Sequence, residues 1–214
     1  MIGRCRILLA ALMLVAAGAP APGEMVAVDA DAYPAGTDMS DLFPHVTLHA
    51  LGSAAGLDGR VYARQASDPA LASTGSNVFG HTVEGTDAHG RPRNETWILP
   101  HVMLGVQFHE PADYVAIDVI SDDDLDLAAL DVYDSAGNLL ASPTTPGLPY
   151  GEVGRFEVSW SSFEISYMVL AGIGGSAVHI DNLEANVIPE PATCLLLALA
   201  AMPLLRKHGP RNVR

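Results

Sequence analysis

Short segments in the middle of the chain alternate apolar and polar residues, and this period of two limits the possible folds most strongly. The clearest are residues 115–119, 156–160 and 165–169. Successive side chains of a β-strand point to opposite faces, so each segment predicts a strand with one buried and one exposed face. No long segment has the 3.6-residue period of an amphipathic helix. The sequence therefore predicts an all-β domain.

A hairpin and the remaining strands follow from turn residues. Residues 130–133 and 139–141 flank the short segment 134–138, in which Gly137 can take the positive φ that a tight turn needs. Eight or nine short strands predict a single, jelly-roll-like β-sandwich. We expect the other strands at 45–51, 60–64, 101–109 and 177–183, and long rim loops at 68–94 and 142–153.

The N-terminal end has the pattern of a secretory signal peptide. Arg4 and Arg6 precede the apolar residues 7–17, and small residues follow at 18–21. Cleavage after Ala21 or after Ala27 fits the pattern. We therefore assign residues 1–23 to a signal peptide.

The C-terminal end combines a Pro-Glu-Pro motif, an apolar run and a basic tail. Two prolines two residues apart keep the motif extended, so a protease could reach it. The apolar residues 192–205 would rise about 21 Å as a helix, against a hydrocarbon core of roughly 30 Å, and so make a marginal span. The basic residues after the run would stay in the cytoplasm. A permanent tail anchor and a buried core helix are the alternatives.

These residues resemble the PEP-CTERM sorting signal of Gram-negative bacteria. In that family an exosortase, a membrane-embedded cysteine transpeptidase, recognises the motif, the hydrophobic helix and the basic cluster together. The resemblance implies exosortase as a partner, transient insertion in the inner membrane, and final location at the cell surface or in the extracellular matrix. It divides the chain into residues 1–23, an ectodomain at 24–187 and the sorting signal at 188–214. The matching sorting residues are Pro189, Glu190, Pro191, Arg206 and Lys207.

The ectodomain carries a second resemblance in several short segments. They are similar to segments that recur in ectodomains with this sorting signal, which are themselves similar to the jelly-roll sandwiches of carbohydrate-binding modules. The resemblance implies a sandwich fold and does not define a ligand. The segments are Ala35-Gly36-Thr37-Asp38, Phe43-Pro44, Thr47-Leu48, Ser73 to Gly80, Tyr133-Asp134, Gly137 to Leu140 and Ile180-Asp181-Asn182-Leu183.

The body of the chain is strongly acidic and has no disulfide. Cys5 and Cys194 both lie in the terminal segments. Residues 24–188 hold 24 of the 25 acidic residues and five of the 11 basic ones, a net charge of −19. Such a body repels nucleic acid and anionic membranes, and divalent cations are its natural counter-ions.

Acidic residues at both ends of the body suggest calcium as the one cofactor. If the first and last strands pair, Asp29, Asp31, Asp38 and Asp181 would supply the hard oxygen ligands that calcium prefers, although no EF-hand spacing is present. The alternative is that these aspartates start loops and are solvated. We interpret Asp122-Asp123-Asp124-Leu125-Asp126 as a solvated loop, because consecutive aspartates in a tight loop would not converge on one ion.

An enzyme is not predicted. The sequence contains no His-Glu-x-x-His, Gly-x-Ser-x-Gly or Ser-x-x-Lys motif. Trp160 alternates with core residues, which leaves Trp97 and Tyr150 as aromatic residues that could stack on a sugar ring. We expect a non-enzymatic, exported surface or matrix protein with a structural or adhesive role in exopolysaccharide. The alternatives are a calcium-assisted carbohydrate-binding module and a polysaccharide hydrolase.

Overall fold

The computed structural model describes residues 23–86, 90 and 92–188, of which Glu24–Val187 form one compact unit. The predicted signal peptide up to residue 22 and the sorting residues Pro189, Glu190, Pro191, Arg206 and Lys207 lie outside this described part. A helix with the length and apolarity to cross a membrane is not found among the described residues.

The described residues form ten strands and three short 3₁₀ helices. In chain order these are β1 Glu24–Val28, η1 Ala30–Ala32, β2 Val46–Gly52, β3 Tyr62–Gln65, η2 Pro69–Leu71, β4 Asn77–Gly80, η3 Arg93–Glu95, β5 Val102–Ser121, β6 Leu127–Tyr133, β7 Leu139–Ala141, β8 Val153–Ser159, β9 Ile165–Ile173 and β10 Val178–Val187.

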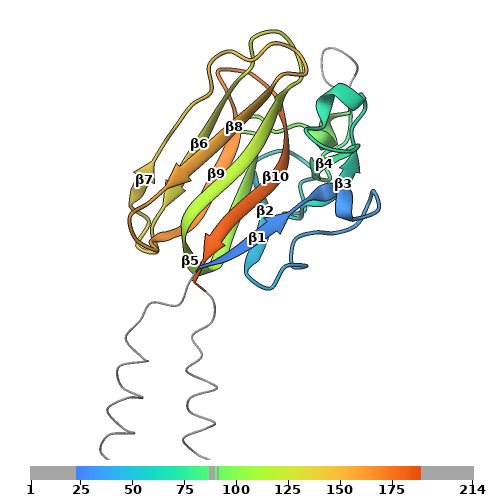
Figure 1. Ribbon diagram of the computed structural model, residues 1–214. Helices are drawn as coiled ribbons and strands as arrows, with labels where there is room; N and C mark the ends of the chain where they lie inside the picture. The colour runs from blue at the N-terminus through green and yellow to red at the C-terminus, as the bar shows by residue number, and fades with distance from the viewer. Residues whose placement is uncertain (1–22, 87–89, 91, 189–214) are drawn as a thin grey trace, which may run out of the picture. The chain divides into compact units, whose positions relative to one another are not determined.

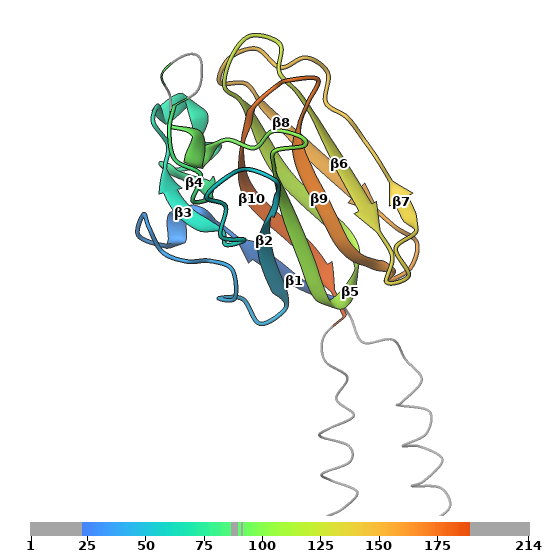
Figure 2. The same ribbon diagram turned by 180° about the vertical axis from the view of Figure 1, so that it is seen from behind.

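Two antiparallel sheets share the long strand β5. Its first half pairs with β2 and β9, and β9 continues through β6 to β7; we name this sheet I. Its second half pairs with β8 and β10, and β10 also pairs with β1 and with β4, which carries β3; we name this sheet II. Figures 1 and 2 show β7 at one side of the sandwich and β3 and β4 at the other. The predicted all-β sandwich is confirmed.

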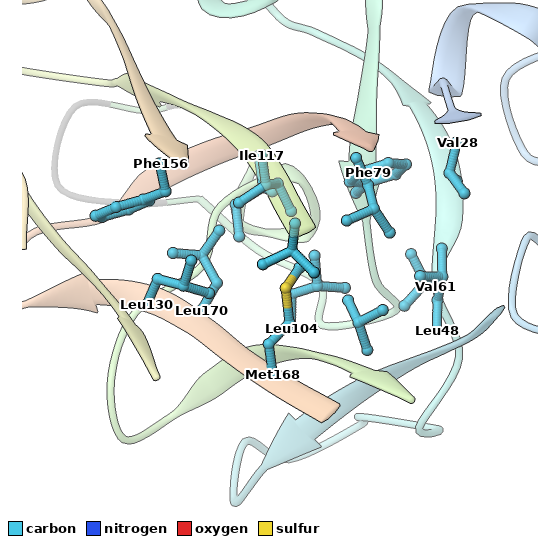
Figure 3. Packing of buried hydrophobic residues seen from close by; sticks show 14 of the residues in the cluster. Val28, Leu48, Val61, Phe79, Leu104, Ile117, Leu130, Phe156, Met168 and Leu170 are labelled. Carbon is cyan, nitrogen blue, oxygen red and sulfur yellow. The ribbon is translucent and has the colours of Figure 1, made fainter. Parts of the chain in front are cut away.

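The core lies between the two sheets. Ile117 and Phe156 of sheet II face Leu130 and Leu170 of sheet I in Figure 3, and all four are at most 4% exposed. The alternation that predicted the strands places these side chains inside, and full burial of each contributes about 1.5–3 kcal/mol.

The structure differs from the predicted strands in three places. The predicted strands 101–109 and 115–119 merge, from residue 102 on, into the single strand β5, because Pro111 sits within a register shift between Gln107 and Ala112, where a missing N–H does not interrupt the ladder. The predicted rim loop 68–94 contains β4, and β1 was not predicted. The hairpin is confirmed: β6 pairs with β7, and Gly137 has φ 84°.

Candidate functional site

Pairing of the first and last strands brings the two ends of the body together. β1 runs antiparallel to β10, from Glu24 opposite Val187 to Val28 opposite Leu183. η1 follows directly, so Asp31 lies beside the part of β10 that contains Asp181. A bulge between Asp181 and Leu183, with Asn182 at φ 46°, interrupts the ladder there.

Asp181 is buried on the outer face of sheet II. Its neighbours Ile180 and Leu183 face the core, so the carboxylate points to the opposite side, where it is nevertheless 0% exposed. Residues 66–76, which connect β3 to β4, cover it; we call this connection the strap. Ser73 Oγ and Thr74 N–H donate to Asp181 Oδ2 at 3.0 and 3.4 Å.

Asp31 is held by the same connection. Ser76 and Asn77 donate their backbone N–H groups to Asp31 Oδ1 at 2.7 and 2.8 Å, and Thr74 Oγ1 donates to Oδ2 at 3.1 Å. Gly75 is required here, because its φ is +48° and a Cβ would overlap the Asp31 carboxylate. The strap thus joins Asp31 and Asp181 through its own hydrogen-bond donors.

A third carboxylate fixes the other end of the strap. Glu95 Oε2 accepts the Ser67 N–H at 2.9 Å, and its Oε1 lies 3.9 Å from Nε2 of His179. Glu95 is 1% exposed, while His179 and Leu71 are 0% exposed. Burial would raise the pKa of Glu95, but His179 and the Ser67 N–H lower it below its usual range. Glu95 is therefore held as a buried carboxylate.

Burial changes the titration of Asp181. Removal from water raises its pKa to about 6, although the hydrogen bonds from Ser73, Asn182 and Thr74 favour the ionised form. The nearby Asp31 carboxylate raises it further. A cation beside both carboxylates would offset this cost.

The structure separates the four aspartates predicted to bind calcium. Asp31 and Asp181 share the strap. Asp29 caps η1, where its Oδ1 accepts the Asp31 N–H at 2.8 Å, and Asp38 pairs with Arg60 at 2.6 Å. Asp31, Asp181 and the Asn182 amide are hard oxygen groups that fit calcium, but the carboxylates already accept N–H and O–H donors. Calcium at this place stays a prediction.

The interpretation of residues 122–126 as a solvated loop is wrong for Asp122 and Asp126 and holds for Asp124 and Leu125, which are exposed. Asp122 and Asp126 are 1% and 2% exposed, and ligand atoms of Asp122, Asp123 and Asp126 lie within 4.8 Å of one another. Asp126 Oδ2 accepts the N–H groups of Asp122 and Asp123 at 2.9 and 3.0 Å, so the carboxylate folds back to close the turn. Asp122 and Asp123 border a cavity of about 660 Å³.

The outer face of sheet I contains an aromatic pair that the sequence analysis missed. Tyr133 and Tyr167 are cross-strand neighbours, and their rings stack with centroids 4.5 Å apart and planes 10° from parallel. The same row continues across the sheet to Gln107 and Thr47. The next row is His49, Gly105, Val169 and Asp131. We call these eight residues the open face.

Hydrogen bonds hold the polar side chains of the open face in place. Asp131 accepts from Tyr133 Oη at 3.3 Å and from Ser142 Oγ. His109, at the edge of the face, must carry its proton on Nδ1 to donate to the Pro44 carbonyl at 2.7 Å, so Thr47 Oγ1 donates to Nε2 at 2.8 Å when the ring is neutral. Burial, then the Asp131 charge, raises the pKa of Tyr133, which keeps this phenol neutral.

The two aromatic residues predicted to bind a ligand have different surroundings. Trp97 is 0% exposed, donates Nε1–H to the Phe79 carbonyl at 2.9 Å and packs edge-on against His81, so it cannot stack on a sugar. Its pairing with Val178 places it inside the molecule. Tyr150 is 45% exposed and donates to Asp68 Oδ2 at 2.8 Å; its role in binding stays a prediction.

Solved structures with similar architecture were found. A family 61 carbohydrate-binding module in complex with β-1,4-galactotriose is 15% identical, with a TM-score of 0.44 over 69% of this chain and 91% of that one. The CBM22-1 xylan-binding domain of Paenibacillus barcinonensis Xyn10C is 12% identical, with a TM-score of 0.42 over 80% and 99%. The K2 adhesin domain of Lys-gingipain is 11% identical, with a TM-score of 0.44 over 77% and 100%. No protein-family model and no curated protein matches the sequence.

Proposed function

We propose that this protein is a non-catalytic glycan-binding module that acts outside the cell, and that the open face of sheet I is its binding surface. The observation that carries the proposal is the stacked pair of Tyr133 and Tyr167, which are half-buried on the outer face of sheet I, in register with Gln107 and Thr47. Sugar rings present C–H groups that pack on aromatic surfaces, while their hydroxyl groups need polar partners beside the ring.

The open face suits such a ligand because its side chains are arranged before binding. The tyrosines support each other, Asp131 fixes one phenol, and Ser166 accepts the Gln107 amide at 2.8 Å. Side chains on strands that are fixed by neighbours lose little freedom on binding. In the second row Gly105 is buried, because the Leu51 side chain lies over it, so a ligand would contact the first row of side chains.

A hydrolase on this face is disfavoured by its carboxylates. Glycoside hydrolysis commonly needs two carboxyl groups about 5–9.5 Å apart, one on each side of the scissile bond. Asp131 is the single carboxylate among the eight residues that define the open face. Release of reducing sugar from the producer's exopolysaccharide would contradict the non-catalytic proposal.

Binding of the secreted protein to a panel of polysaccharides, by affinity electrophoresis and calorimetry, tests the function. We expect Tyr133→Ala and Tyr167→Ala each to weaken binding at least tenfold, about 1.4 kcal/mol. Tyr150→Ala is the matched control, because it removes an exposed tyrosine outside the open face, and we expect less than a twofold change. Loss of binding in Tyr150→Ala alone would move the site to the residue predicted from the sequence. Unchanged melting temperatures would exclude unfolding.

A purely structural role in the matrix is the rival function. A matrix component without a ligand would bind none of the polysaccharides, and the tyrosine substitutions would change only its stability. The glycan panel therefore distinguishes the two functions directly.

The proposed place of action rests on the chain ends. Pro189, Glu190 and Pro191, with Arg206 and Lys207 after the apolar run, support processing by exosortase and release to the surface or matrix. The intact mass of protein extracted from the surface should lack both terminal segments. Retention of residues 192–214 in cells with active exosortase would refute the sorting proposal.

A further inference from the structure

We infer that the glycan bound by the open face is uncharged, and that polyuronates and amino-sugar polymers are not its ligands. This inference rests on the proposed function and adds the chemical class of the ligand.

The positive charge of the described body lies away from the open face. The body carries a net charge of −19, and two of its arginines pair with acidic groups away from the open face. Arg155, on sheet II, contacts Asp118, Glu157 and Glu184 at 2.9, 3.2 and 2.9 Å. Arg60 pairs with Asp38.

The other two described arginines also lie elsewhere. Arg64 is on β3, where its Nη2 donates to the His81 carbonyl at 3.1 Å, and Arg93 borders the 660 Å³ cavity. The eight residues of the open face include no lysine or arginine. A polyuronate would therefore approach a negatively charged body and find no fixed cation at the face.

The open face itself carries a negative charge. Asp131 is the acidic residue among the eight, and Tyr133 stays a neutral phenol. A sugar carboxylate near the tyrosine pair would face Asp131 without a counter-charge. Uncharged hydroxyl groups, in contrast, carry no charge for Asp131 to repel and can donate to a phenol oxygen.

Asp131 would interact differently with uncharged sugars and with amino sugars. Asp131 already accepts from Tyr133 Oη and Ser142 Oγ. An ammonium group that paired with Asp131 would compete with these two donors, which hold the tyrosine in place. A cationic polymer would instead be attracted to the acidic body as a whole, and this attraction falls with ionic strength.

The experiment measures binding of the secreted protein to three classes of polymer at 10 and 500 mM NaCl. The neutral class contains polymers of glucose, galactose, xylose and mannose; polygalacturonate and chitosan represent the charged classes. We expect at least one neutral polymer to bind with a Kd that changes less than twofold with salt and rises at least tenfold in Tyr133→Ala. Binding to polygalacturonate should be at least tenfold weaker. Any binding to chitosan should vanish at high salt, and Tyr133→Ala should leave its Kd unchanged.

A charge substitution sharpens the result. Asp131→Lys places a cation beside the tyrosines and should produce polygalacturonate binding at 10 mM NaCl. Asp124→Lys, at an exposed position in the β5–β6 loop, changes the net charge equally and should not. Polygalacturonate or chitosan bound more tightly than every neutral polymer, in a way that depends on Tyr133, would overturn the inference and leave the proposed function standing. Failure of all polymers to bind would overturn the proposed function itself.

Discussion

The outer faces of the two sheets differ in how far they are exposed to solvent. On sheet II, Ile120, His179 and Asp181 point away from the core, yet all three are 0% exposed. The strap covers Asp181 through Ser73 and Thr74, whereas Arg155 and Glu157 on the same face are exposed. On sheet I, His49 and Gln107 are exposed at equivalent outward positions. Part of one outer face is covered and adds to stability, and the other face is the proposed binding surface.

The difference comes from the lengths of two connections. β6 and β7 are joined by the tight turn at residues 134–138, whose length lets it cover little of the sheet. β3 and β4 are joined by the strap, which is long enough to fold back over sheet II. Buried carboxylates then accept its N–H groups, because backbone groups removed from water need partners. A long loop with acidic partners can thus bury part of the outer face of a sheet.

The largest expected effect is from shortening a buried side chain of the strap. Leu71 is 0% exposed and lies outside the main core cluster. Leu71→Ala should destabilise the protein by about 2–4 kcal/mol through lost burial and a cavity. Val169→Ala, the matched substitution on the open face, should cost less than about 1 kcal/mol. Urea denaturation measures both, and equal losses would show that the two faces are packed alike.

The pH dependence of stability tests the burial of Asp181. Its pKa of about 6 in the folded state exceeds the unfolded value near 3.9, so the folded state binds more protons between these values. The contribution of Asp181 to the free energy of unfolding is complete below pH 4. It falls by about 3 kcal/mol in total as the pH rises through 6. Asp181→Asn should remove this decline, measured with chelator present. If the variant kept the pH dependence of stability of the wild type, the Asp181 carboxylate would be solvated and not buried.

Calcium should change the free energy of unfolding by a slightly smaller amount, and this change tests the predicted calcium site. An ion whose Kd is a hundredfold below its free concentration adds about 2.7 kcal/mol and raises the melting temperature. The gain should be larger at pH 7 than at pH 5, because protons compete for Asp181. It should fall in Asp31→Ala and Asp181→Ala and persist in Asp123→Ala. A melting curve that chelator leaves unmoved would reject calcium at the strap.

The fold was predictable from the sequence where local patterns dominate. The alternation in residues 165–169 and the turn around Gly137 each act within one or two strands, and both are confirmed. β4 was not predicted, because Asn77–Gly80 is short and lies in a segment rich in turn residues. Its partners β3 and β10 stabilise it, and pairing between distant segments leaves no local pattern.

The candidate sites were less predictable, for the same reason. The pairing of first and last strands suggested that Asp31 and Asp181 would meet, but the strap's role depends on residues 73–77, about a hundred positions before Asp181. Trp97 was predicted to stack on a sugar ring, but the structure buries it. Tyr133 and Tyr167 could have been noticed, since each alternates with core residues and therefore points outward. Their register with each other is visible only in the folded chain.

The most direct test of the account maps the ligand on the two faces by NMR. A neutral oligosaccharide would be titrated into the isotopically labelled protein while backbone amide shifts are followed. The account predicts shifts concentrated at Tyr133, Tyr167 and Gln107, and none at the strap residues Ser73 and Ser76. Shifts centred on the strap or on Tyr150, with the open face unchanged, would contradict the assignment of one face to stability and the other to binding.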